Sequence, residues 1–177
     1  MTSTMPTASL SIDQRTGIRH LMDLAFLGGF DDDDFDHALG GLHFLVEEHG
    51  TLVAHAAVVQ RSFLHGGRAY RCGYVEAVAV HPDRRGQGFA AAVMSAAESV
   101  IDRAYDLGAL SASAAGRGLY VARGWLPWLG RTAVLAPDGL TFTAEDDDST
   151  FVRPVPGGPV LDRTGTLTCD YRNGDVW

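Results

Sequence analysis

The sequence predicts one α/β (α+β) domain over residues 1–177, with a mixed, mostly antiparallel sheet and helices on both faces. Length supports this, because 177 residues correspond to about one domain and can bury a core without disulfides or metal ions. A composition of 46% hydrophobic and 20% charged residues is typical of a globular chain. The third observation is a block of three consecutive strand-like runs joined by glycine turns, with helical patterns before and after it.

The N-terminal part predicts two helices. Ser11 and Gln14 have the spacing of a capping box, and Gly28-Gly29 ends the helix that follows. Between them, apolar residues recur at helical spacing, namely Ile18, Leu21, Met22, Ala25 and Phe26. The aspartates at 31–34 precede a second, short helix, where the positive end of its macrodipole favours negative charge.

The middle of the chain predicts an antiparallel meander. Its strands are expected at residues 42–48, 51–63 and 68–80, with His49-Gly50 and His65-Gly66-Gly67 as the turns. The later elements are a helix at 88–103, a strand at 109–111, a helix at 116–123, a strand at 128–135, a loop at 137–159 and a last strand at 165–171.

The charge balance excludes several classes of function. All fourteen basic residues are Arg, so no lysine is present for a Schiff base, a pyridoxal-phosphate enzyme or a Walker phosphate loop. A net charge of −8 argues against a nucleic-acid partner and suits a polycationic one, although it also serves solubility.

The termini and cysteines predict a reduced, cytoplasmic chain. Residues 1–10 lack the pattern of a signal peptide, and no run reaches the roughly 20 apolar residues of a membrane span. Cys72 and Cys169 have no metal-ligand spacing, and Cys72 lies in an apolar run that predicts a buried position. The seven histidines are scattered, so no metal site is expected.

The segment from Val78 to Ala90 predicts a strand, a Pro-Asp turn, a glycine-rich loop and a helix start. Glycines let backbone N–H groups approach an anion closely, and the helix N-terminus adds partial positive charge. Arg84 and Arg85 can add bidentate contacts to phosphate oxygens. The residues alone leave two interpretations open, a phosphate-binding turn or an ordinary turn with two solvated arginines.

Arg85-Gly86-Gln87-Gly88-Phe89-Ala90 resembles the Arg/Gln-x-x-Gly-x-Gly/Ala signature of the Gcn5-related N-acetyltransferases at all four fixed positions. The segment 119–125 resembles the helix of that family that ends in Tyr-x-x-x-Gly-aromatic. Blocks at 39–43, 70–76, 108–113, 124–128 and 174–177 are similar to the aminoglycoside 2′-N-acetyltransferases, and the likeness extends roughly from residue 12 to the end.

This resemblance implies an acetyltransferase fold, acetyl-CoA as co-substrate, no metal, and a homodimer. It implies that the coenzyme is bound by Val78, Ala79, Val80, Arg85, Gly86, Gln87, Gly88, Phe89 and Ala90. Within that set, the Val78 N–H group would polarise the thioester carbonyl, and Val78 and Val80 would bond the pantetheine arm. On the residues alone, both valines are equally typical of a core.

Glu76 lies on an otherwise apolar predicted strand, where a lone carboxylate is costly unless it is paired or used. The resemblance implies that it is the general base, acting through water, and an ion pair with an arginine is the alternative. Tyr120 has an ordinary pKa near 10, and the resemblance implies that it protonates the departing thiolate. The alternative is a buried aromatic with a hydrogen-bonded hydroxyl. Neither cysteine lies where a nucleophile is expected, so direct transfer in a ternary complex is predicted.

A substrate with several ammonium groups needs carboxylates and hydrogen-bond acceptors. The resemblance implies as substrate residues Asp34, Glu76, Ala77, Ser111, Glu145, Asp146, Asp175 and the terminal carboxylate of Trp177. Acidic runs are usually solvated faces, but a chain that ends on an aromatic residue supports a functional tail, since termini commonly fray.

One position departs from the family pattern, because Gly29 stands where the family carries Asp. The missing carboxylate leaves open a narrower acceptor, such as a kasugamycin-type aminoglycoside with fewer amines. Two further hypotheses are an acetyltransferase for another metabolite or peptide amine and a non-catalytic ligand-binding module. The presence of both Glu76 and Tyr120 argues against the binding module.

Overall fold

The computed structural model describes residues 1–177, and the chain divides into two compact units. The first unit comprises Met1–Val59 and Val75–Val100, and the second comprises Gln60–Tyr74 and Ile101–Trp177. Strands β3 (Thr51–His65) and β4 (Arg68–Val80) each contribute residues to both units. The single domain expected over the whole chain remains a prediction. No helix combines the length and the apolar character that crossing a membrane requires.

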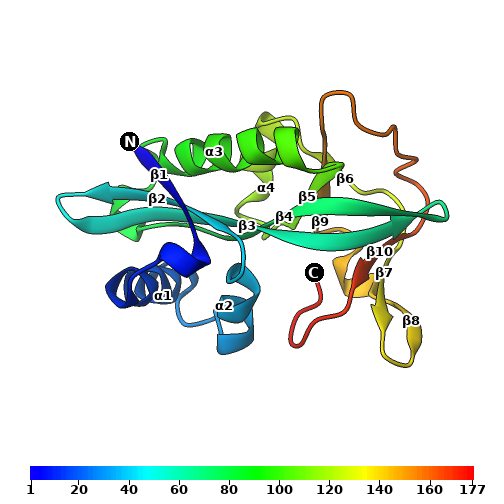
Figure 1. The fold of residues 1–177 in the computed structure, drawn as a ribbon, viewed down its shortest axis with the longest axis horizontal. Helices are drawn as coiled ribbons and strands as arrows, with labels where there is room; N and C mark the ends of the chain where they lie inside the picture. The colour runs from blue at the N-terminus through cyan, green and yellow to red at the C-terminus, as the bar shows by residue number, and fades with distance from the viewer. The chain divides into compact units, whose positions relative to one another are not determined.

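The first unit places helices on both faces of its strands (Figure 1). Strand β1 (Thr2–Pro6) pairs antiparallel with β2 (Leu42–Glu48), which pairs antiparallel with the first part of β3. Helices α1 (Ile12–Phe26) and α2 (Asp32–Ala38) lie on one face, and α3 (Phe89–Ala104), most of which belongs to this unit, lies on the other. Short 3₁₀ turns, η1 (Thr7–Ser9) and η2 (Pro82–Arg84), precede α1 and α3.

Local sequence accounts for both N-terminal helices, as predicted. Ser11 Oγ accepts the Gln14 N–H group at 3.1 Å, and the Gln14 side chain accepts the Ser11 N–H group at 3.0 Å. Asp31 and Asp34 form the same reciprocal cap at the start of α2. The apolar face of α1 then joins the core of this unit, which contains Leu10, Ile18, Leu21, Met22, Phe30, Leu45 and Ala79.

The second unit contains a mixed sheet in the order β6-β9-β5-β4-β3-β10-β7-β8. Its remaining elements are β5 (Leu107–Ser111), α4 (Arg117–Ala122), β6 (Leu126–Pro127), β7 (Thr132–Ala136), β8 (Gly139–Phe142), η3 (Ala144–Asp146), β9 (Thr150–Pro154) and β10 (Leu167–Asp170). The β4–β5 and β7–β10 pairs are parallel, whereas β3–β10, β5–β9, β6–β9 and β7–β8 are antiparallel. The predicted mixed, mostly antiparallel sheet is therefore confirmed.

Two local predictions were wrong, and one strand was missed. The expected strand at 128–135 is interrupted, because the N–H groups of Leu129 and Gly130 both donate to the Arg163 carbonyl, and β7 begins only at Thr132. The expected loop at 137–159 contains β8, η3 and β9. The polar N-terminus forms strand β1, which was not expected. Backbone pairing with β2 does not require apolar side chains, so the composition of β1 gave no signal.

Candidate active site

Strand β4 is irregular at Ala77. The φ angle of Ala77 is +51°, in the left-handed region, although the residue lies inside a strand. This backbone conformation costs a non-glycine residue about 1–2 kcal/mol and persists only where the surroundings hold it. His55 on β3 provides one such contact, because its Nδ1 lies 2.7 Å from the Ala77 carbonyl oxygen. The extended course of β4 is therefore interrupted between Glu76 and Val78.

The residues around Ala77 differ in burial. The side chains of Glu76, Val78 and Val80 are half-buried. Ala79 is only 4% exposed and belongs to the core of the first unit. The side chain of Ala79 thus has a packing role, and only its backbone is available to a coenzyme.

The segment after β4 forms an exposed turn before α3. His81 donates its N–H group to the Val53 carbonyl at 2.8 Å, which ties the start of the turn to β3. Gly86 and Gly88 have φ angles of +75° and +83°, and a Cβ atom added to either would meet nothing within 4 Å. Because the first N–H groups of a helix have no acceptor within it, the turn and the start of α3 offer donors to an anion. The turn predicted to bind the diphosphate is thus glycine-rich, exposed and followed directly by a helix start.

The two arginines of the turn already have protein partners. Arg84 Nε donates to Glu48 Oε2 at 3.0 Å. Arg85 Nη2 donates to the Ala25 carbonyl at the C-terminal end of α1, also at 3.0 Å. Arg85 keeps further N–H donors for a phosphate, whereas Arg84 is held in an ion pair with Glu48.

Asp34 has a local structural role. Its Oδ2 accepts the Asp31 N–H group at 3.0 Å and so caps α2. The next residue, Phe35, packs on the same core cluster as Ala77. The structure therefore brings α2 and the irregular part of β4 into one neighbourhood of the first unit.

Tyr120 is the buried residue of α4 in the second unit. It is 7% exposed, and its ring lies 6.2 Å from Trp125 and 6.4 Å from Phe151, centroid to centroid. Burial raises the pKa of Tyr120 to about 12. The phenol is thus protonated at neutral pH and has a proton to donate.

The predicted acidic residues of the second unit form a connected cluster. Ser111 Oγ donates to Ser149 Oγ at 3.0 Å, and Ser149 Oγ donates to the Asp146 carbonyl at 3.2 Å. Asp146 is half-buried, and burial together with the negative charges of Asp175 and Glu145 raises its pKa to about 6. Glu145 itself is exposed.

The C-terminal tail is anchored to the second unit. Trp177 is 4% exposed, and its Nε1 donates to Thr143 Oγ1 at 2.8 Å. Asp175 Oδ1 accepts the Trp177 N–H group at 3.0 Å, and Arg172 donates to a terminal oxygen of Trp177 at 2.9 Å. The tail therefore brings the Asp175 carboxylate close enough to Asp146 to raise its pKa, and Arg172 is already bound to the terminal group of Trp177.

Sequence reasoning missed the residue that fixes this tail. Arg61 on β3 is 4% exposed; it donates to Asp170 Oδ1 and to the Val176 carbonyl, both at 2.8 Å. An arginine within a strand of mostly buried residues was the available signal. The paired histidines His43 and His55 were missed as well, because they lie twelve residues apart.

Both cysteines are buried and unpaired with each other. Burial raises the pKa of Cys169 to about 11 and the pKa of Cys72 well above its usual value. Both thiols are therefore protonated at neutral pH. No group of three or more His, Cys, Asp or Glu side chains is arranged to hold a metal ion.

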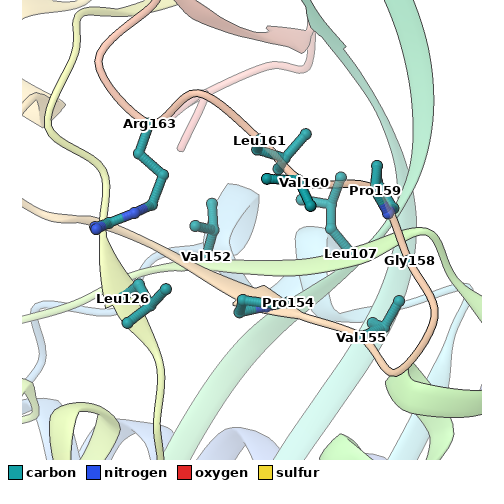
Figure 2. A pocket seen from close by; sticks show the side chains of 10 residues that line it. All are labelled: Leu107, Leu126, Val152, Pro154, Val155, Gly158, Pro159, Val160, Leu161 and Arg163. Atoms are coloured by element: carbon teal, nitrogen blue, oxygen red, sulfur yellow. The ribbon is translucent and has the colours of Figure 1, made fainter.

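A separate apolar cavity of about 320 Å³ lies in the second unit (Figure 2). Leu126 and Val152 line one side and Leu161 another, and Arg163 is its one charged residue. The Arg163 guanidinium donates to the Pro127 carbonyl at 2.6 Å. None of the predicted site residues lines this cavity, so we assign it no part in the chemistry.

Comparison with known proteins identifies the family of the chain and a close relative. The model of the acetyltransferase (GNAT) family matches residues 14–125. An aminoglycoside 2′-N-acetyltransferase of Mycolicibacterium fortuitum is 57% identical over 173 residues, which cover 97% of this chain and 89% of the relative.

Solved structures show the same fold at low sequence identity. Escherichia coli ElaA is 20% identical with a TM-score of 0.58, over 86% of this chain and 98% of that protein. An acyl-CoA N-acyltransferase of Pseudomonas aeruginosa is 17% identical with a TM-score of 0.56, over 88% of this chain and 99% of that protein.

Proposed function

The chain belongs to the acetyltransferase (GNAT) family, and we propose that it transfers the acetyl group of acetyl-CoA to the 2′-amino group of an aminoglycoside antibiotic. This reaction would confer resistance to the antibiotic. The observation that carries the choice of acceptor is the 57% identity to the M. fortuitum enzyme over nearly the whole chain. The acidic cluster of the second unit agrees with a polycationic acceptor, because carboxylates bind ammonium groups.

The coenzyme would be held by the turn between β4 and α3. Backbone N–H groups of Gly86, Gln87 and Gly88, and those of Phe89 and Ala90 at the start of α3, would donate to the diphosphate. Arg85 would add a charged donor. Backbone groups of Val78, Ala79 and Val80 would bond the pantetheine arm. Acetyl-CoA supplies the acetyl thioester and the thiolate leaving group.

In this proposal two side chains move the protons. Glu76 takes a proton from the acceptor ammonium group through a water molecule, and the resulting amine nitrogen bonds to the acetyl carbon. As the carbon–sulfur bond breaks, the nitrogen passes its second surplus proton to solvent, which leaves a neutral amide. Tyr120 gives its phenolic proton to the sulfur, and solvent returns a proton to the phenolate. The Val78 N–H group donates to the acetyl oxygen as negative charge develops on it. The raised pKa values of both cysteines support direct transfer without an acyl-enzyme.

On the acceptor side, we assign Asp34, Glu76 and Ala77 of the first unit, and Ser111, Glu145, Asp146, Asp175 and the Trp177 carboxylate of the second. Gly29 supports a second candidate, a kasugamycin-type acceptor with fewer amines, because a carboxylate of the family pattern is missing there. An added Cβ at Gly29 would lie 3.2 Å from the Phe26 carbonyl oxygen, so an aspartate would need a small local shift. A cytoplasmic location and a homodimer belong to the same proposal.

The test is release of free thiol from acetyl-CoA with matched acceptors. Two aminoglycosides that differ only in an amino or a hydroxyl group at the 2′ position form the acceptor pair, and kasugamycin is the third acceptor. We expect thiol release with the 2′-amino compound and none with its 2′-hydroxyl partner. Turnover with kasugamycin alone would select the narrow acceptor range. Absence of CoA binding in calorimetry would overturn the proposal.

A further inference from the structure

A chain of hydrogen bonds crosses the core of the first unit from η1 to the end of β4. Thr7 Oγ1 lies 2.8 Å from His43 Nε2, and His43 Nδ1 lies 3.0 Å from His55 Nε2. His55 Nδ1 in turn lies 2.7 Å from the Ala77 carbonyl oxygen. Both imidazoles have no exposed surface, and neither has a part in the proton transfers proposed above.

The direction of every bond in this chain follows from its last acceptor. The Ala77 carbonyl can only accept, so His55 carries its proton on Nδ1 and its Nε2 accepts from His43 Nδ1. His43 Nε2 then accepts the Thr7 hydroxyl proton. The Gly40 N–H group donates to Thr7 Oγ1 at 2.8 Å and completes the chain. Both rings are thereby held in one tautomer.

Both rings are neutral at neutral pH. Burial lowers the pKa of His55 to about 3 and the pKa of His43 to about 4. The positive charge of Arg15 on α1 lowers the pKa of His43 further, and Arg15 itself donates to the Thr7 carbonyl at 3.1 Å. A neutral His55 donates one hydrogen bond from Nδ1 and leaves no charge beside β4.

The bond from His55 fixes a peptide plane. The Ala77 carbonyl and the Val78 N–H group belong to one planar peptide, and the chain contains no cis peptide bonds. In a trans peptide the two groups point in opposite directions. A carbonyl turned toward His55 therefore directs the Val78 N–H group away from it, and the left-handed backbone at Ala77 is what turns this plane.

We propose that His55 is a positioning residue for acetyl transfer: its bond to the Ala77 carbonyl sets the orientation of the Val78 N–H group, a role that rests on the proposed function. If the buried histidines had only a structural role, every variant of the hydrogen-bond chain would lose stability. Catalysis would then change only in proportion to the loss of folded protein.

Three variants separate the two roles. His55→Leu removes the donor to Ala77, whereas His55→Asn keeps it, because an Asn amide nitrogen can occupy the place of Nδ1. Thr7→Val breaks the chain at its far end and leaves the His55–Ala77 contact in place. We expect His55→Leu to lower kcat by about tenfold or more, because the Val78 N–H group remains but is misdirected and so loses part of the roughly 10²–10³ that an oxyanion donor contributes. The KM for the acceptor should change little.

The other two variants are the controls in the same measurement of kcat. His55→Asn is expected to recover most of kcat, and Thr7→Val to keep the wild-type kcat while losing stability. Equal kcat in His55→Leu and Thr7→Val, compared at equal fractions of folded protein, would overturn the positioning role. The positioning role would also be overturned if the kcat of His55→Asn were no higher than that of His55→Leu.

Nitrogen NMR of the wild-type imidazoles gives a readout that does not depend on activity. Two-bond ¹H–¹⁵N spectra are expected to show a protonated Nδ1 and an unprotonated Nε2 on both buried rings. A proton on Nε2 of His55 overturns the positioning role even in an active enzyme. If the wild type transfers acetyl to no acceptor while the spectrum is as expected, the proposed function fails and the hydrogen bond to Ala77 stands.

Discussion

Glu76 is a half-buried carboxylate next to a left-handed residue, and its proposed work is to accept a proton from the acceptor amine. Glu76→Gln keeps the shape of the side chain and removes its basicity. We expect kcat to fall by about a hundredfold, a typical contribution of a general base, and the acidic limb of the pH–rate profile to disappear. Affinity for CoA in calorimetry should be retained. Wild-type kinetics in Glu76→Gln would remove the base assignment.

Tyr120→Phe is a matched test of the proton donor, because the ring stays packed against Trp125 and Phe151 while only the hydroxyl is lost. We expect kcat to fall by about tenfold or more with unchanged thermal stability. Because the pKa of Tyr120 is about 12, activity of the wild type should not decline through ionisation of this phenol below about pH 10. An unaltered rate in the variant would assign protonation of the thiolate to water.

Asp146 makes acceptor binding depend on pH. Its pKa is raised to about 6 by burial and by Asp175 and Glu145, so part of the population is protonated at pH 6. A polycation binds the ionised form, so binding should release protons and tighten as pH rises from 5 to 7. Calorimetry in buffers of different ionisation enthalpy measures the released protons. Asp146→Asn should abolish this component, and an identical release in the variant would place the cation elsewhere.

At the scale of residues, sequence patterns predicted the side chains whose role depends on near neighbours in the chain. They missed the side chains that are held by partners far away in the sequence. Gly86 and Gly88 were recognisable because the turn and the helix start that need them are adjacent in the chain. The partner of His55 is 22 residues away, and the partner of Arg61 at Val176 is 115 residues away. No spacing rule joins such pairs. The left-handed backbone of Ala77 is equally invisible, since alanine has no preference for it.

At the scale of elements, predictions succeeded where the ends of an element are encoded by its own residues. The start of α1 is marked by a capping box and its end by Leu27 and Gly28, both with positive φ. Strand β9 has no such signal: it is a short segment whose Phe151 and Val152 become buried by pairing with β5 and β6. An element stabilised mainly by its neighbours cannot be recognised before those neighbours are known.

The turn before α3 can be tested with a control turn of the same geometry. Gly88 and Gly67, in the turn between β3 and β4, have φ angles of +83° and +76°, and neither has an atom within 4 Å of an added Cβ. Alanine at either position therefore carries a similar backbone strain, on the order of 1–2 kcal/mol. We expect only Gly88→Ala to weaken CoA binding, by about tenfold, because its methyl group occupies the approach of the anion. An equal effect of Gly67→Ala on CoA affinity would show that the loss reflects stability.

At the scale of the whole molecule, each compact unit holds a different part of the proposed chemistry. The first contains the coenzyme turn, Glu76 and the hydrogen-bond chain to Ala77, and the second contains Tyr120 and the acidic cluster with the anchored tail. The hydrophobic core of the first unit includes Ala79 and packs against Ala77, so stability and site geometry share residues there. Conditions that charge the buried histidines should therefore affect folding as well as catalysis.

This coupling predicts a loss of stability in mild acid. The folded pKa values of His43 and His55, about 4 and about 3, lie below the ordinary value of 6.5, so the unfolded chain binds protons first as pH falls. The stabilisation is thus complete well above pH 6.5 and declines through the range down to the folded pKa values, by about 1 kcal/mol per histidine at pH 5.5. Asp146 contributes in the opposite direction, because its raised pKa makes folding more favourable as pH falls below about 6.

Denaturant unfolding at pH 7.5 and 5.5 measures the change in the free energy of unfolding between the two pH values. His55→Asn should reduce this change by the contribution of one histidine. The exposed His20→Gln is the control. An equal pH dependence of stability in the wild type and in His55→Asn would mean that His55 is not buried in its neutral form.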